Sequence, residues 1–237
     1  MMDFVGELLG TFILVLLGNG VVAGNVLKGT KGENTGWIMI TLGWGLAVTL
    51  GVLVSGFYSP AHLNPAVSIA FAVLGQVSWG TAFMYIIAQM IGAMLAQVVV
   101  WLQYLPHWDM TPDPETKLAA FSTAPAVRDT TSNFIGEVVG TAVLVIGVMA
   151  MGPNNLSSGF GPFVVGAIVA SIGLSLGGTT GYAINPARDL GPRIVYQFLP
   201  MKNKGNADWG YAWIPVLGPI VGGIVGGLIY NLVLAGI

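Results

Sequence analysis

The chain has 237 residues, of which 54% are hydrophobic and only 8% are charged, and it contains 35 glycines. Long uncharged stretches of this kind are typical of a polytopic membrane protein and exclude an ordinary soluble domain. The formal net charge is −2 and there is no cysteine. Disulfides and thiolate metal sites are therefore excluded, and no basic stripe indicates a nucleic-acid partner.

Six stretches are long and apolar enough to cross a bilayer as helices. In chain order they cover residues 4–26, 37–57, 79–105, 134–152, 160–178 and 210–236. A shorter apolar stretch follows the second span at residues 66–75, and another follows the fifth at residues 187–198. At about 1.5 Å rise per residue, each covers roughly half of a 30 Å hydrocarbon core. We predict that both are half-helices.

The chain divides into two halves of similar plan, residues 1–105 and 134–237, joined by a polar loop at residues 106–133. The sequence Gly-Glu-Leu-Leu-Gly-Thr opens the first half at Gly6, and Gly-Glu-Val-Val-Gly-Thr opens the second at Gly136. Each half has three full spans, an odd number, so the second half inserts upside down relative to the first. This inverted repeat predicts one all-α domain over residues 1–237, with its substrate site near the midplane.

Each half-helix begins at the tripeptide Asn-Pro-Ala, with Asn64 in the first copy and Asn185 in the second. Asparagine is a favoured N-cap, and proline fits the first helical position. In an inverted repeat the two N-termini meet, so two positive dipole ends and two side-chain amides face one spot. Both asparagines are expected to line a pore there and repel cations, although capping alone would also explain them.

Together, the paired motif, the inverted repeat and the opening glutamates resemble the aquaporin superfamily over essentially the whole chain. The segments Ala-His-Leu-Asn-Pro-Ala-Val at residues 61–67 and Asn-Pro-Ala-Arg-Asp at residues 185–189 match its signatures. The aspartate after the arginine resembles the glycerol-facilitator branch. The resemblance implies a homotetramer with one pore per subunit, located in the plasma membrane with cytoplasmic termini, and no cofactor.

The resemblance also implies a selectivity filter made of Trp44, Gly173, Tyr182 and Arg188. An arginine is expensive inside a membrane, so Arg188 is expected to face a water-filled cavity. Trp44 and Tyr182 would form an apolar wedge opposite its donors, and Gly173, without a side chain, would leave a wider opening than a histidine. This wall suits a linear polyol. Glycerol facilitators usually carry phenylalanine where Tyr182 stands.

The extended residues before each motif are expected to present carbonyl oxygens to the pore, because irregular backbone is tolerated at membrane depth where it lines water. In the first half these residues are Ser59, Pro60, Ala61 and His62, and in the second they are Gly181, Tyr182 and Ala183. Pro60 replaces the glycine expected from the family. The His62 side chain is interpreted as structural, since no second histidine, cysteine or acidic cluster accompanies it.

Glu7 and Glu137 are acids inside apolar spans, which is a functional signal. They could relay protons in a coupled transporter, or they could accept N–H groups of the re-entrant loops, which lipid cannot satisfy. Their equivalent positions in the repeats and their use in the family favour the scaffold role. Asp189 is assigned to the same loop scaffold.

One signal disagrees with the family over orientation. All eight lysines and arginines lie between spans one and two, three and four, or five and six. The positive-inside rule would place those connections in the cytoplasm, whereas the family places the termini there. We follow the family because Arg188 and Arg193 lie in a re-entrant segment.

The sequence therefore predicts a passive channel for glycerol, other small uncharged solutes and water that excludes ions and protons. An alternative within the class is a channel mainly for undissociated short acids, urea or hydrogen peroxide. An ion-coupled carrier would share the broken helices, but only Glu7 and Glu137 could form its coupling site. A membrane enzyme is least favoured, because the spans hold no nucleophile–base set or metal-ligand cluster.

Overall fold

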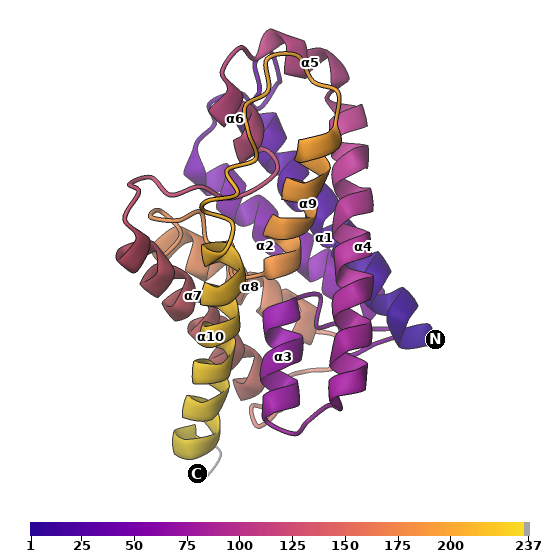
Figure 1. Ribbon diagram of the computed structural model, residues 1–237. Helices are drawn as coiled ribbons and strands as arrows, with labels where there is room; N and C mark the ends of the chain where they lie inside the picture. Colours follow the sequence, from indigo (N-terminus) through magenta and orange to yellow (C-terminus); the bar gives the residue numbers. More distant parts are fainter. Residues whose placement is uncertain (235–237) are drawn as a thin grey trace.

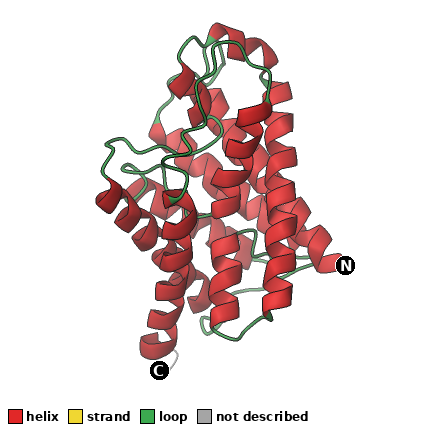
Figure 2. Ribbon diagram, viewed as in Figure 1, coloured by secondary structure: helices red, strands yellow, loops and turns green. Residues whose placement is uncertain are grey.

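The computed structural model describes residues 1–234, which form a bundle of helices around two short central ones (Figure 1). No strand occurs in this part of the chain (Figure 2). The helices, in chain order, are α1 (Met2–Val26), α2 (Trp37–Ser55), α3 (Pro65–Val73), α4 (Trp79–Gln103), α5 (Leu105–Met110), α6 (Pro114–Ala119), α7 (Thr130–Ala150), α8 (Gly161–Ser175), α9 (Pro186–Phe198) and α10 (Ile214–Ile229), followed by a π-helical turn at Tyr230–Leu234.

The predicted order of six long helices and two half-helices is confirmed. The helices α1, α2, α4 and α7, and α10 with its continuation, are long and apolar enough to span a membrane. Helix α8 has 15 residues, and about 1.5 Å per residue gives it a length of roughly 22 Å. It ends before the predicted residue 178 because Gly177 and Gly178 are poor helix formers. Residues 235 and 236 of the predicted sixth span lie outside the described residues.

The connection predicted as a polar loop at 106–133 contains two short helices, α5 and α6, which corrects the sequence interpretation. Proline stands near the start of both. In α6 the Asp113 side chain caps the helix by accepting a hydrogen bond from the Thr116 N–H at 2.8 Å. These are ordinary helix-start signals, but the helices are too short to show an apolar period.

The two halves pack as an inverted repeat. Helix α1 packs on α4, and its counterpart α7 packs on α10. Each half-helix contacts the last span of both halves, so α3 lies against α10 and α4, and α9 lies against α4 and α10. In Figure 1, α9 stands above α3 at the centre, with α5 and α6 at the top and with the N-terminus and the far end of α10 in the lower half.

Glycine lets α10 pack closely against α7 and the half-helix α3. A Cβ atom on Gly226 would lie 2.5 Å from the carbonyl oxygen of Ala142 in α7, and one on Gly223 would lie 2.9 Å from that of Ala66 in α3. Real Cβ atoms do not approach so closely, so α10 fits between α7 and α3 only where it lacks side chains. This is the small-residue packing that membrane helices use for close approach.

A second apolar core lies under the connections at the α5 end. The rings of Trp108 and Phe121 are 5.4 Å apart, and those of Phe121 and Tyr196 are 5.0 Å apart. Asn19 bonds both the Phe121 carbonyl oxygen at 2.9 Å and the Gln97 side chain at 2.5 Å. The connection between the halves is thereby fixed to α1 and α4 beside the half-helix α9.

We expect Gly222→Ala to destabilise the protein, because its Cβ would collide with the Val138 backbone in α7. Overpacking of this kind costs about 1–3 kcal/mol, so the melting temperature in detergent should fall by several degrees. Gly20→Ala is the matched control, since it lies in the spanning helix α1 with no atom within 4 Å of the new Cβ. Equal melting temperatures for the two variants would contradict the packing argument.

Candidate functional site

The two Asn-Pro-Ala motifs meet at the centre of the molecule, and each asparagine binds both halves. The Asn64 side-chain oxygen accepts from the Ala66 N–H at 2.9 Å, and its amide donates to the Ile184 carbonyl oxygen at 2.7 Å. Asn185 caps its own half-helix in the same way and donates to the Leu63 carbonyl oxygen at 2.8 Å. Because an amide nitrogen carries two N–H groups, a second donor remains on each asparagine.

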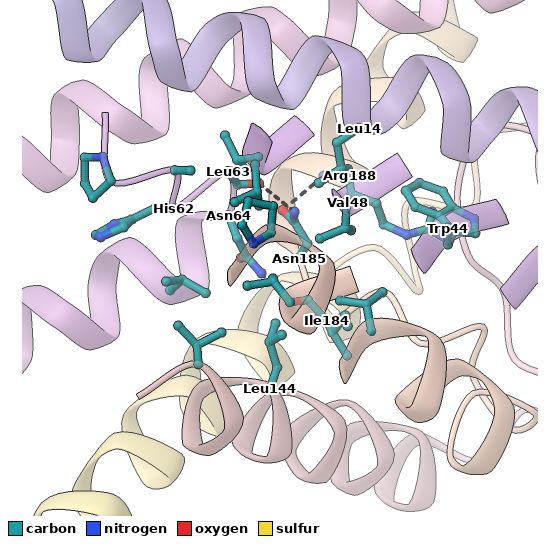
Figure 3. Close-up of a pocket in the computed structure, with 18 of the residues that line it drawn as sticks. Leu14, Trp44, Val48, His62, Leu63, Asn64, Leu144, Ile184, Asn185 and Arg188 are labelled. Carbon is teal, nitrogen blue, oxygen red and sulfur yellow. Dashed lines mark hydrogen bonds between the residues drawn. The ribbon is translucent and has the colours of Figure 1, made fainter. Parts of the chain in front are cut away.

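Both asparagines line a cavity of about 280 Å³. Figure 3 shows them between Trp44 and Arg188 on one side and His62 on the other. Much of the wall is apolar and comes from spanning helices of both halves: Leu14, Val48, Val52, Leu144, Val148, Val165 and Val169. The residues preceding the motifs that contribute to the lining are Pro60, Ala61, His62, Leu63, Tyr182, Ala183 and Ile184. The cavity is therefore amphipathic.

The backbone before each motif has an unusual conformation that repeats in the two halves. Ala61 and Leu63 have φ angles of 57° and 51°, and the equivalent Tyr182 and Ile184 have 39° and 43°. These residues stand three and one positions before each asparagine. Non-glycine residues in this left-handed region cost of order 1–3 kcal/mol each, so the surrounding structure must hold them. Such strain clusters at functional sites.

Two buried carboxylates hold these strained segments. Glu7 accepts from the N–H groups of His62 and Leu63 at 2.8 and 2.7 Å. Glu137 accepts from those of Ala183 and Ile184 at 3.0 and 2.8 Å. With these N–H groups directed at the acids, the adjoining backbone is free to turn its carbonyl oxygens toward the cavity. Neither carboxylate lines the cavity itself.

Further side chains donate hydrogen bonds to each carboxylate. Glu7 accepts from the Ser59 hydroxyl at 2.9 Å and from Gln89 at 2.8 Å, and Glu137 accepts from Thr180 at 2.6 Å. Ser59 is one of the predicted carbonyl contributors, and it lies outside the cavity lining, as does Gly181. Gln89 and Thr180 were not predicted. A polar residue in an apolar span, as Gln89 is in α4, is the signal that could have identified it.

Trp44 and Arg188 lie together at one end of the cavity. The Arg188 guanidinium carbon is 4.1 Å from the centre of the Trp44 ring, which is close enough for a cation–π interaction. Tyr182 also lines the cavity, and its ring meets Trp37 edge-on at 5.7 Å. Gly173 lies behind Tyr182 rather than in the lining. Three of the four predicted filter residues are thus brought to the cavity, and the fourth supports one of them.

Asp189 and Arg193 form a buried ion pair at 2.9 Å on successive turns of α9. Asp189 accepts from the N–H and hydroxyl of Thr123, both at 2.7 Å, and Arg193 donates to the carbonyl oxygens of Thr123 and Ala207 at 2.9 and 2.7 Å. The pair therefore fixes the connection before α7 and the connection before α10 to the half-helix α9, which also carries Arg188. Arg193 was not predicted for this role, although an arginine four residues after an acid on a helix indicates a pair.

The bundle, the two half-helices and the cavity at their junction define an α-helical membrane channel. Residues 1–230 match the model of the major intrinsic protein family, and the chain belongs to that family. It is 57% identical over 218 residues to a glycerol uptake facilitator protein of Streptococcus pneumoniae (strain ATCC BAA-255 / R6), covering 92% of this chain and 93% of that one. It is 54% identical over 232 residues to glycerol uptake facilitator protein 3 of Lactiplantibacillus plantarum, covering 98% and 97%.

Among solved structures, the chain resembles the aquaglyceroporin from Plasmodium falciparum with a TM-score of 0.88. The two are 33% identical, and the alignment covers 99% of this chain and 97% of that one. The predicted family and the predicted all-α membrane fold are confirmed.

We expect Glu137→Gln to destabilise the re-entrant loop, because an amide has one acceptor oxygen and would direct its own N–H groups at a backbone donor. Hydrogen bonds to charged groups contribute about 1.5–3 kcal/mol each, so the melting temperature should fall and all solute fluxes should drop. Glu115→Gln, at an exposed position of α6, is the control. A variant as stable as this control would show that the carboxylate does not hold the loop.

Proposed function

We propose that this protein is a passive channel that conducts glycerol, other small uncharged solutes and water, and that it excludes ions and protons. The observation that supports the proposal best is the amphipathic cavity, which both asparagines line. A linear polyol has carbon on one edge and hydroxyls on the other, which matches a wall that combines apolar side chains of the spans with the polar groups of the motifs and Arg188. The names of the similar proteins, glycerol uptake facilitators and an aquaglyceroporin, support the same solute.

Within this channel Asn64 and Asn185 form the pore centre. Their remaining N–H groups and the two half-helix dipoles orient the oxygen of a solute or water molecule there. That molecule then cannot pass a proton to the next molecule in the pore. Trp44, Tyr182 and Arg188, with Gly173 behind, form the filter. The carbonyl oxygens of the segments before the motifs offer acceptors along the way, and the proposed set is Pro60, Ala61, His62 and Ala183, since Ser59 and Gly181 lie outside the cavity lining.

Glu7, Glu137 and Asp189 act as the loop scaffold in this proposal. Glu7 and Glu137 accept hydrogen bonds from backbone N–H groups of the re-entrant segments, and Asp189 accepts from Thr123 in the connection between the halves. A proton-coupled carrier would need a carboxylate exposed to the substrate path, and the lining of the cavity includes none. The scaffold role is therefore favoured over coupling. Conduction of solute, without chemical conversion, is the activity that the family membership supports.

We further propose a homotetramer in the plasma membrane with cytoplasmic termini, as the resemblance implied. The N-terminus and the far end of α10 lie away from the end that carries α5 and α6 (Figure 1). Three ion pairs stabilise the connections near that end: Lys28–Glu33, Arg128–Asp208 and Lys202–Asp109. Arg193 is fully buried and paired, so it does not act as a loop charge in the positive-inside comparison.

Proteoliposomes containing the purified protein should re-swell in glycerol faster than empty liposomes, at rates independent of imposed proton or sodium gradients. Light scattering after an osmotic step measures this, with sucrose as the non-permeant control. Urea, hydrogen peroxide and undissociated short acids tested in parallel rank the alternative solutes. Glycerol permeability at the level of empty liposomes would overturn the proposed solute, and flux that follows an ion gradient would indicate a carrier.

Arg188→Val should raise the leak of protons or small cations while uncharged solutes still pass. The substitution removes a fixed positive charge, and such charges set electrostatic barriers to cations in pores. A pH-sensitive dye inside the liposomes measures the leak. Lys31→Val, which removes a charge from the connection before α2, is the control. An unchanged leak in a correctly assembled protein would show that the central asparagines and dipoles suffice without Arg188.

A further inference from the structure

We infer that Thr123, in the connection between the two halves, is a positioning residue for the filter. Its hydroxyl holds the first turn of α9, from which Arg188 projects, at a fixed place relative to the first half of the chain. The inference deepens the proposed function and rests on it, because it names a residue that sets selectivity from outside the cavity lining. We call residues 120–126 the connecting segment.

Thr123 is bonded to the first turn of α9 through both its backbone and its side chain. The N–H and the hydroxyl of Thr123 donate to the same carboxylate oxygen of Asp189, each at 2.7 Å. The Thr123 carbonyl oxygen accepts from Arg193 at 2.9 Å, and Arg193 pairs with the other oxygen of Asp189. All three residues are buried. Because Asp189 directly follows Arg188, these bonds fix the part of the helix that presents Arg188 to the cavity.

The connecting segment also lies against the backbone that leads to Tyr182. A Cβ atom on Gly181, the residue before Tyr182, would lie only 3.2 Å from the Cβ and Cγ2 atoms of Thr123. Gly181 has a φ angle of 81°, which favours glycine. The Ala126 N–H donates to the Thr179 carbonyl oxygen at 2.9 Å and joins the same two stretches of chain. Thr123 therefore lies beside the backbone of two filter residues.

The connecting segment is held independently by two spans of the first half. The Asn19 side chain in α1 donates to the Phe121 carbonyl oxygen at 2.9 Å, and the Gln97 side chain in α4 donates to that of Ala120 at 3.4 Å. Both amides are buried and bonded to each other. The position of Thr123 is thus set by α1 and α4 as well as by its partners in α9.

This arrangement links filter residues that come from different halves. Trp44 belongs to the first half and Arg188 to the second, and the Arg188 guanidinium carbon lies 4.1 Å from the centre of the Trp44 ring. Their spacing depends on how α9 is placed against the first half, and the bond from the Thr123 hydroxyl to Asp189 is one of the contacts that place it. Without that hydroxyl the first turn of α9 is held less tightly, so the filter should admit larger solutes.

The test measures glycerol, xylitol and water permeabilities of Thr123→Val in proteoliposomes. Valine keeps the shape of threonine but cannot donate to Asp189. We expect the ratio of glycerol to xylitol permeability to fall about fivefold relative to the parent. Thr123→Ser keeps the hydroxyl and should keep the parent ratio.

Thr116→Val is the matched control. The N–H and hydroxyl of Thr116 also donate to one carboxylate oxygen, that of Asp113, but this pair caps α6 and lies outside the cavity lining. The control should therefore conduct like the parent. If Thr123→Val keeps the parent ratio, or if Thr123→Ser loses it to the same extent as Thr123→Val, the positioning role is overturned.

The Arg188→Val background separates positioning from a loss of stability. Because the Thr123 hydroxyl acts on the filter through Asp189 and Arg188, Thr123→Val should not lower the ratio further in that background. The melting temperature should fall in both backgrounds, since the buried bond to Asp189 is lost in each. An equal fall of the permeability ratio with and without Arg188 would overturn the inference.

Two further comparisons keep the inference testable if a variant or the proposed solute fails. Thr123→Ser and Thr123→Ala differ only by the hydroxyl, so they replace the comparison with valine if Thr123→Val does not assemble, and equal ratios for this pair would overturn the inference. A parent that passes no glycerol would overturn the proposed function. The ratio of water to xylitol permeability then tests the position of α9 in the same variants, and an unchanged ratio would overturn the role of Thr123.

Discussion

Backbone N–H groups at membrane depth must find partners within the protein, and the rest of this structure follows from how two buried carboxylates meet that requirement. Glu7 and Glu137 each accept two consecutive N–H groups just before an asparagine. Those bonds stabilise four non-glycine residues with positive φ, and the strained segments in turn place both asparagines at the centre. The carboxylates therefore hold the strained backbone that precedes both half-helices and lines the cavity beside them.

The repeat supplies the frame, and departures from it give the two ends of the channel different chemistry. Arg188 and Asp189 have Val67 and Ser68 as their counterparts in the first copy of the motif. Asp189 is therefore paired with Arg193 and bonded to Thr123, whereas Ser68 bonds to His62 and Gln89. A charged side chain facing the cavity occurs at the end with Trp44, which is where a filter can discriminate by charge and by donor geometry.

Much of this architecture could be predicted from the sequence because it depends on local rules. The length of the apolar stretches predicted the spans, and asparagine followed by proline predicted where the half-helices begin. The odd number of spans in each half required the halves to be inverted. The positive φ angles at Ala61, Leu63, Tyr182 and Ile184 could not be predicted, because alanine, leucine, tyrosine and isoleucine all disfavour them. The short helices α5 and α6 were missed because a few residues show no apolar period. The early end of α8 was missed because length and hydrophobicity were weighed there and the poor helix propensity of Gly177 and Gly178 was not. Arg193 was placed in the re-entrant segment but given no structural role, although Asp189 stands four residues before it; the carbonyl oxygens that complete its contacts belong to Thr123 and Ala207, in connections outside α9.

Gly173 shows most clearly why selectivity could not be predicted from the sequence alone. The sequence records that a side chain is missing, and the simplest interpretation is an open space in the pore. The structure fills that space with the Tyr182 ring, which lies against Gly173 and Gly177 and meets the Trp37 ring edge-on. The same device places α10 against α7 and α3, where glycine lets one element approach the backbone of another. Since the carboxylate bonds hold the backbone before each motif, the side chains at this level, including those packed behind the cavity wall, are what differ between one such pore and another.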